Sequence, residues 1–141
     1  MNKKTGLTVA GIFVVIVASF SVWSYINHLD YLEKTVHESE RWMVIMDSKG
    51  DIIAVETTSN VIWNQLEELY ASKERRWIGG IVEEYNNKWG FRLQPDTITI
   101  AEITIEGAQS NIHGISGDLN YWIKIWANIA YVMASVVEIH E

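Results

Sequence analysis

The side chains that could do acid–base or metal chemistry in this chain are four histidines and a scatter of carboxylates. The histidines are His28, His37, His113 and His140. No two of them stand four residues apart or in a His-x-His pattern, so the spacing of a metal site is missing. We therefore predict no metal centre, no cofactor and no catalytic residue.

One alternative stays open. A fold that brings His113 to Glu102, with Glu106 and Asp96 close by, would form a small metal-binding or hydrolytic site. The sequence offers no other route to catalysis, because it has no cysteine, no Gly-rich phosphate loop and no Gly-x-Ser-x-Gly motif. Binding is thus the chemistry that we expect of this chain.

Aromatic side chains are the most numerous groups suited to binding. Six of the seven tryptophans lie beyond residue 26, and an exposed tryptophan near tyrosines makes an anchor for a partner. Trp63 lies off the best apolar face of its predicted helix, and Trp89 is close to Tyr85 in sequence. With acidic residues from the following turn and strand, the predicted binding residues are Trp63, Tyr85, Trp89, Asp96, Glu102 and Glu106.

A long uncharged segment precedes the part of the chain that carries the predicted binding residues. Leu7–Ile26 contains no charged side chain, and a helix of 20 residues spans about 30 Å, the thickness of a bilayer's hydrocarbon core. Lys3 and Lys4 precede the segment and Asp30 follows it, so the positive-inside rule predicts a cytoplasmic N-terminus. We predict a single-pass transmembrane signal-anchor over residues 1–26 and an extracytoplasmic remainder.

A cleaved signal peptide is the competing interpretation. Lys3-Lys4 would be its basic region and Leu7 to Ala18 its apolar region, with small residues before a cut near Ser19 or Ser21. Both interpretations export the rest of the chain. The anchor is favoured because the apolar run continues past the possible cut to full spanning length.

Residues 27–41 predict a juxtamembrane helix or stalk, with Leu29, Leu32 and Val36 on one face. Beyond residue 26 the chain carries nine basic and 18 acidic residues, a net charge of −9. Nucleic-acid backbones are repelled by that sign, so no nucleic-acid partner is expected. The predicted partners are the lipid bilayer, through residues 7–26, and a membrane or envelope protein.

Residues 42–141 begin with a predicted hairpin and helix. Trp42–Met46 and Ile52–Val55 flank turn residues that include Gly50, the pattern of a β-hairpin. Ser59 or Thr58 can cap the helix that follows. The expected apolar stripe of this helix is Val61, Ile62, Leu66, Leu69 and Tyr70.

Strand-like composition then returns. Residues 75–85 predict a strand in which Gly79 and Gly80 mark a bend or a close backbone approach, and residues 89–93 predict a short strand between two turns. From Thr97 to Ile105 isoleucines alternate with other residues, with a shift of phase at Ala101 and Glu102. We interpret this as one long strand with a β-bulge, its isoleucines all facing inward.

The last segments predict a helix and a central strand. Ile112–Trp126 has helical spacing of apolar residues, and Ser116 is a possible N-cap after the weakening Gly114. Residues 131–139 are apolar on both faces, as in the middle of a sheet. The expected class is α+β: after the transmembrane helix, a mainly antiparallel sheet packs with two helices in an exported domain over residues 42–141.

The stretch from Tyr85 to Trp122 resembles the amino-terminal domain family of the BP-seventy-four protein, a small module of exported or surface proteins. The matching positions are Tyr85, Asn86, Trp89, Phe91, Pro95, Asp96, Ile98, Ala101, Glu102, Ile105, Glu106, Leu119, Tyr121 and Trp122. The match covers Arg75–Ile139 well, Trp42–Glu74 in outline, and residues 1–26 not at all.

This chain departs from the family pattern at several positions. Arg92 and Gln94 stand where members often have a histidine and an acidic residue, and residues 108–109 replace a Cys-Asp pair. A Cys-Pro-Trp run is replaced by residues 132–134. The resemblance implies export and a binding or adhesion-type module. The predicted function is a membrane-anchored extracytoplasmic interaction domain, an accessory subunit or partner-recognition module of an envelope complex.

Overall fold

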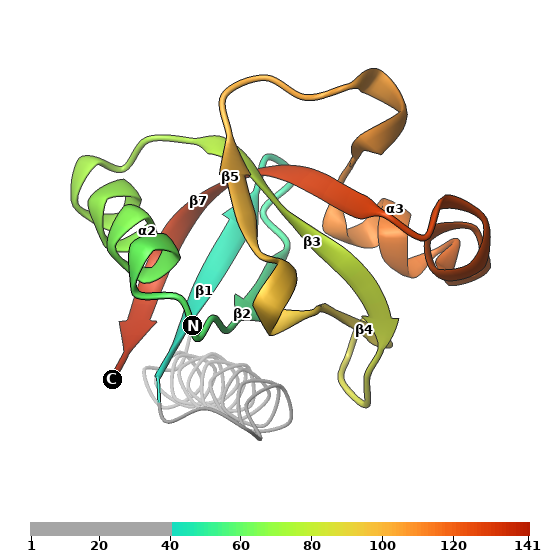
Figure 1. The fold of residues 1–141 in the computed structure, drawn as a ribbon, viewed down its shortest axis with the longest axis horizontal. Helices are drawn as coiled ribbons and strands as arrows, with labels where there is room; N and C mark the ends of the chain where they lie inside the picture. Colours follow the sequence, from blue (N-terminus) through green and yellow to red (C-terminus); the bar gives the residue numbers. More distant parts are fainter. Residues whose placement is uncertain (1–40) are drawn as a thin grey trace, which may run out of the picture. The chain divides into compact units, whose positions relative to one another are not determined.

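The computed structural model describes residues 41–141, which form a mainly antiparallel sheet with a few helices, an α+β domain (Figure 1). In chain order the elements are β1 Trp42–Asp47, β2 Ile52–Val55, α2 Asn60–Ser72, β3 Arg76–Glu84, β4 Phe91–Leu93, a 3₁₀ turn Pro95–Thr97, β5 Thr99–Ala101, a 3₁₀ turn Glu106–Ala108, β6 Gln109–Ser110, α3 Ile112–Ser116, a π-helix Tyr121–Trp126 and β7 Ile129–His140. The predicted signal-anchor over residues 1–26 and all but the last residue of the stalk over 27–41 lie outside the described residues. Within residues 41–141 no helix has the length and apolarity needed to cross a bilayer.

The predicted hairpin of β1 and β2 is confirmed. Met43 pairs with Val55 and Met46 with Ile52, which leaves residues 47–51 as the turn. Gly50 has a φ of 85°, a left-handed conformation that favours glycine, and its N–H donates to the carbonyl of Asp47 at 3.1 Å.

The predicted central strand is β7. The first half of β7 pairs antiparallel with β3, and its second half pairs antiparallel with β1. The short strand β6 adds the one parallel pairing among the described strands, also with β7. Gly79 of β3 lies where a Cβ atom would come within 2.6 Å of the carbonyl oxygen of Ala130. Of the predicted glycine pair, Gly79 therefore marks a close backbone approach to β7, whereas a Cβ at Gly80 would meet only side-chain atoms of Leu93, Thr97 and Ile98.

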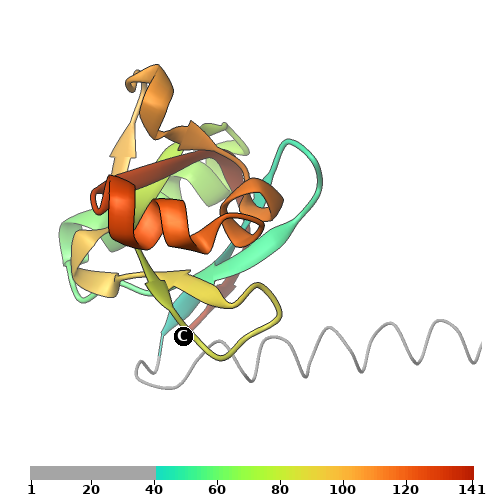
Figure 2. The same cartoon turned by 90° about the vertical axis from the view of Figure 1, so that its right-hand side faces the viewer.

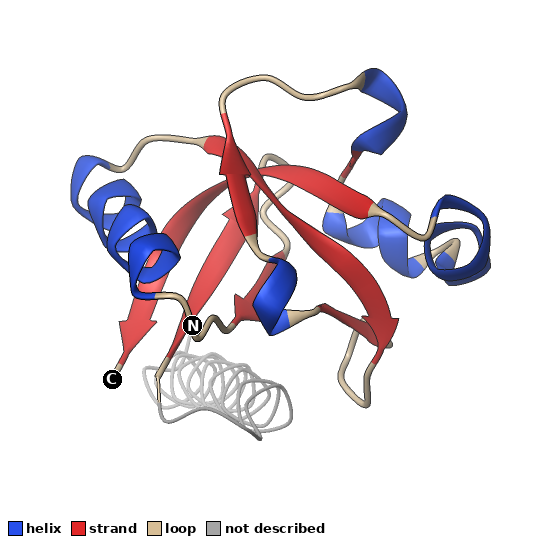
Figure 3. Cartoon of the chain, viewed as in Figure 1, coloured by secondary structure: helices blue, strands red, loops and turns tan. Residues whose placement is uncertain are grey.

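The sheet curves until its two outer strands approach each other, so that it is nearly a closed barrel (Figure 3). Trp89, just before β4, bridges these strands, because its Nε1 donates to the carbonyl of Ile52 in β2 at 2.7 Å. Phe91, Ile45 and Ile53 are among the fully buried side chains of the core. Helix α2 and the helices α3 and Tyr121–Trp126 lie at opposite ends of the curved sheet (Figure 1).

Helix α2 begins where predicted, and its predicted apolar stripe is confirmed in part, since Leu66 and Leu69 are buried and Ile62 is half-buried. Ser59 is the N-cap and accepts a hydrogen bond from the N–H of Ile62 at 3.3 Å. The buried residues are Trp63, Leu66 and Leu69, whereas Val61 and Tyr70 of the predicted stripe are exposed. The large indole of Trp63 takes the core position, since it buries more apolar area than a valine does.

The predicted long, bulged strand over residues 97–105 is wrong. Ile98 is buried and Ile100 half-buried, as expected, but β5 ends at Ala101, and Ile103 and Ile105 are 88% and 66% exposed. Ala101 pairs with Trp77, the second residue of β3. The chain beyond Ala101 therefore runs past the end of its partner strand, and no ladder remains to hold these isoleucines inward.

The predicted helix over residues 112–126 is divided in two. Helix α3 is capped by Asn111, whose side chain accepts a hydrogen bond from Gly114 at 2.7 Å, and it ends at Gly117. Ser116 is not the N-cap, because its hydroxyl donates to the carbonyl of Trp89 at 2.7 Å. Three residues of the predicted apolar stripe are nevertheless buried, namely Ile112, Ile115 and Trp122.

Candidate functional site

The predicted binding residues fall in separate parts of the domain. Tyr85 and Asp96 lie on either side of β4, Trp89 bridges β4 and β2, and Trp63 belongs to α2. Glu102 and Glu106 flank the exposed isoleucines beyond β5. The fold therefore builds two candidate surfaces from this set, one beside β4 and one beyond β5.

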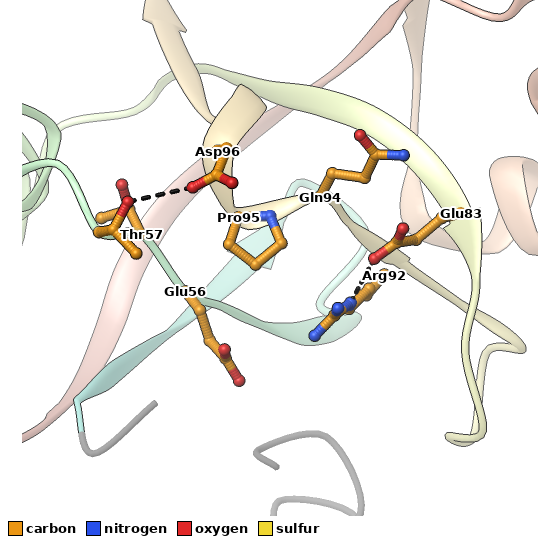
Figure 4. Close-up of a pocket in the computed structure, with 8 residues that line it drawn as sticks. Glu56, Thr57, Glu83, Arg92, Gln94, Pro95 and Asp96 are labelled. Atoms are coloured by element: carbon orange, nitrogen blue, oxygen red, sulfur yellow. Dashed lines mark hydrogen bonds and ion pairs between the residues drawn. The ribbon is translucent and has the colours of Figure 1, made fainter. Parts of the chain in front are cut away.

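A cavity of about 360 Å³, here called the β4 cavity, lies between β2, β3 and the turn after β4 (Figure 4). Its walls come from the chain after β2 and from the β3–β4 hairpin with the turn that follows it. The lining residues are Glu56, Thr57, Thr58, Glu83, Arg92, Gln94, Pro95 and Asp96.

The charged groups of the β4 cavity are held by neighbouring side chains. Arg92 donates from Nε to Glu83 Oε1 at 2.5 Å, and its guanidinium lies over the ring of Tyr85, 4.5 Å from the centroid. Asp96 accepts a hydrogen bond from the hydroxyl of Thr58 at 3.0 Å. With Glu56, three carboxylates border this cavity against one guanidinium, which favours a cationic group over an anionic one.

Trp89 is chiefly a structural residue. Its ring is half-buried, its Nε1 is hydrogen-bonded to β2, and its carbonyl accepts from Ser116 of α3. Lys88 extends over the ring at 4.8 Å from the centroid. The polar atom that a partner would use is therefore already engaged inside the domain.

The expectation that Trp63 is an exposed anchor is wrong. Its side chain is 3% exposed and packs in the core, and its Nε1 donates to Glu67 Oε1 at 2.7 Å, one turn further along α2. Arg41 covers the ring at 4.6 Å from the centroid. A side chain this deeply buried offers almost no surface to a partner.

Residues 102–106, here called the apex segment, form the second candidate surface. Glu102 and Glu106 are exposed at its two ends, with Ile103 and Ile105 between them. Beside it lies a cavity of about 400 Å³ between α2 and β5. The residues that line this second cavity are Gln65, Glu68, Leu69, Ser72, Glu74, Arg76, Ile100, Ala101 and Glu102.

The structure does not gather the residues of the metal-binding alternative. Asp96 borders the β4 cavity, Glu102 borders the cavity beside α2, and His113 is an exposed residue of α3 that lines neither. Among residues 41–141 no group of three or more histidine or acidic side chains is placed to hold a metal ion. The alternative thus has no assembled site in the described part of the chain.

Comparison with known proteins identifies no relative: no family model, no curated protein and no solved structure matches the chain. The resemblance to the BP-seventy-four amino-terminal domain family therefore stays a prediction.

Two arrangements of charged side chains escaped the sequence prediction. The ion pair of Glu83 and Arg92 had a partial signal, because these residues lie on the two strands that flank the predicted turn at Asn86-Asn87-Lys88, and the structure pairs them directly. The buried carboxylate of Asp47 had no such signal. It accepts from the N–H groups of Lys49 and Asp51 in its own turn and from Ile112, 65 residues further along the chain.

Proposed function

We propose that this chain is a membrane-anchored extracytoplasmic binding domain. Residues 7–26 span the lipid bilayer with the N-terminus in the cytoplasm, residues 27–41 form a stalk, and residues 42–141 recognise a membrane or envelope protein. In this proposal the protein is an accessory subunit or partner-recognition module of an envelope complex.

The observation that carries the proposal is the division of the chain into two parts of opposite character. Leu7–Ile26 has no charged residue, whereas the part beyond residue 26 has a net charge of −9. A segment of 20 apolar or uncharged residues favours lipid, and the flanking Lys3 and Lys4 favour the cytoplasmic side. An acidic domain is soluble on the far side and is repelled by anionic lipid headgroups.

The described domain supports binding rather than catalysis. Burying a fully exposed isoleucine stabilises a complex by roughly 1.5–3 kcal/mol, and Ile103 and Ile105 both leave most of their surface in water. Asp96 in the lining of the β4 cavity, with Tyr85 behind Arg92, offers a second contact surface. Neighbouring exposed apolar side chains with a polar rim are typical of a surface that another protein covers.

The anchor is tested by fractionation of cells that express the full chain. We expect the 16.2 kDa chain, uncleaved, in the membrane pellet after carbonate washing, with residues 42–141 accessible to protease only from the outer side. Val14→Arg, at the centre of the uncharged segment, should reduce the membrane fraction, whereas Thr5→Arg outside the segment should leave it unchanged. An intact chain dissolved in the cytosol would overturn the proposal.

The binding role is tested separately. A tagged full chain, extracted in a gentle detergent, should co-purify with another membrane or envelope protein in a fixed ratio. A chain that elutes alone as a monomer under these conditions, even after cross-linking in intact cells, would contradict a binding role.

A further inference from the structure

We propose that the apex segment, residues 102–106, is the docking surface for a segment of a partner protein that carries lysine or arginine beside aliphatic side chains. This inference rests on the proposed binding function and adds to it the site and the chemistry of the partner.

The apex segment combines two kinds of exposed side chain. Ile103 and Ile105 are among the five large apolar side chains that the described residues leave exposed, and they stand two positions apart. Glu102 and Glu106 bracket them, both exposed. A partner that covers the isoleucines must also place groups beside two carboxylates, so it needs positive charge next to its own apolar side chains.

The base of the apex segment is fixed to the domain. Ala108 is buried and donates its N–H to the carbonyl of Ile105 at 3.0 Å, and Gln109 donates from Nε2 to the carbonyl of Thr104 at 3.3 Å. Gly107 lies against the ring of Trp126, since a Cβ there would be 3.8 Å from it. With β5 before it and β6 after it, the segment presents its isoleucines in a preorganised conformation, which reduces the entropy cost of binding.

The cavity beside the apex segment adds negative charge. Glu68 of α2 lines it together with Glu102, and the cation at its rim, Arg76, forms an ion pair with Glu74 at 2.7 Å. The net charge of the lining side chains is therefore negative. An anionic lipid surface and a second copy of this acidic segment are both disfavoured as occupants, because each would bring like charges together.

The apex segment also lies where a partner can reach it. The start of β1 and the end of β7 lie at one end of the domain, where Trp42 pairs with His140. The chain between β5 and β6 projects from the opposite end, as Figure 1 and Figure 2 show from two directions. A domain tethered through the residues before Trp42 would thus present the apex segment away from its point of attachment.

The test is photo-cross-linking of the full chain in the membranes of its own cells. The photoreactive amino acid p-benzoylphenylalanine replaces Ile103, which is 88% exposed, in one variant and Val61, which is 67% exposed, in the control. We expect position 103 and not position 61 to form an adduct with another protein, and the cross-linked peptide to contain lysine or arginine beside aliphatic residues. An adduct with lipid or with a second copy of the chain, or a partner peptide without basic residues, would overturn the inference.

Two sets of substitutions then separate the apolar and the charged contributions. Ile103→Ser with Ile105→Ser should reduce the amount of partner that co-purifies by about tenfold or more, and Val61→Ser should not. Glu102→Gln with Glu106→Gln should weaken binding less and reduce its sensitivity to salt, whereas Glu84→Gln, at an exposed position in β3, should change neither. Equal effects in the variants and their controls would show that the apex segment is not the contact.

Failure of this inference differs from failure of the proposed function. If p-benzoylphenylalanine at Tyr85 or Asp96 captures a partner and position 103 does not, the domain binds through the β4 cavity and the inference alone is wrong. If no position captures a protein and the full chain purifies alone, the binding function is wrong as well.

Discussion

Asp47 and the apex segment both depart from the usual rule that folded proteins bury apolar side chains and expose charged ones. At Asp47 a carboxylate is buried, with 2% of its surface exposed, whereas Ile103 of the apex segment leaves 88% of its side chain in water. Folded proteins rarely bury a carboxylate without partners, and they rarely expose neighbouring large aliphatic groups. The two regions therefore each require a physical explanation.

The explanation differs between them. The buried carboxylate of Asp47 accepts three backbone N–H groups, from Lys49 at 3.0 Å, Asp51 at 3.1 Å and Ile112 at 2.9 Å, so its cost is offset inside the domain. Nothing within the described domain covers Ile103 or Ile105 in the same way. Asp47 therefore serves the fold, whereas no contact among residues 41–141 accounts for the exposed isoleucines of the apex segment, which is the observation behind the proposed docking surface.

The largest effect is expected at Asp47. Asp47→Ala removes the acceptor of three N–H groups, one of which fixes α3 to the β1–β2 turn, and should lower the free energy of unfolding by about 3 kcal/mol. Urea denaturation of the full chain in detergent, followed by circular dichroism, measures this. Asp51→Ala removes the same charge from the same turn, but none of the described hydrogen bonds uses its side chain. Similar losses in the two variants would show that charge, not hydrogen bonding, stabilises the turn.

A smaller loss is expected from Gly79→Ala, which disturbs the interior without removing a polar group. The new Cβ would lie 2.6 Å from the carbonyl oxygen of Ala130, and backbone atoms cannot move aside easily, so about 2 kcal/mol of stability should be lost. Gly80→Ala is the control, because its Cβ would meet only side-chain atoms, at 3.0 Å or more. The same denaturation experiment compares them, and an equal loss would mean that β3 and β7 can separate at Gly79.

Trp89 lies between the two extremes, since it is a half-buried aromatic residue whose polar atom is satisfied inside the fold. Trp89→Phe removes the 2.7 Å hydrogen bond to Ile52 and should lower stability by about 1 kcal/mol. Trp77→Phe should cost less, because the indole N–H of Trp77 has no acceptor among the described residues. If Trp89→Phe left stability unchanged but reduced co-purification of a partner, Trp89 would be a contact residue, as the sequence predicted, and not a structural one.

Much of the fold was predictable because it depends on neighbouring residues. The β1–β2 turn, the Ser59 cap and the apolar run of β7 all have local signals, and all three are confirmed. The length of β5 was not predictable, because it depends on where β3 begins. The alternating isoleucines have strand propensity up to Ile105, but a strand needs a partner at each residue, and Ala101 is the last to have one.

The candidate site was less predictable than the fold. Trp63 was assigned to the exposed side of α2 because Val61 and Tyr70 fitted the predicted apolar stripe. In the structure, Trp63 is buried with Leu66 and Leu69, and Val61 and Tyr70 are exposed. The misassignment of Ile103 and Ile105 to the core hid the exposed apolar surface from the sequence prediction. Exposure of single side chains depends on long-range packing, which one sequence does not reveal.

The smallest stability effect is expected at the apex segment itself. Ile103→Ser with Ile105→Ser should change the free energy of unfolding by less than about 0.5 kcal/mol, because exposed side chains lose little on folding. Ile98→Ser, only a few residues away but buried, should cost about 3 kcal/mol by the same measurement. A large loss from the double substitution would mean that Ile103 and Ile105 are covered within the chain in solution. The contrast with Asp47 would then disappear, because both regions would be explained by the fold, and no outside partner would be needed to account for the isoleucines.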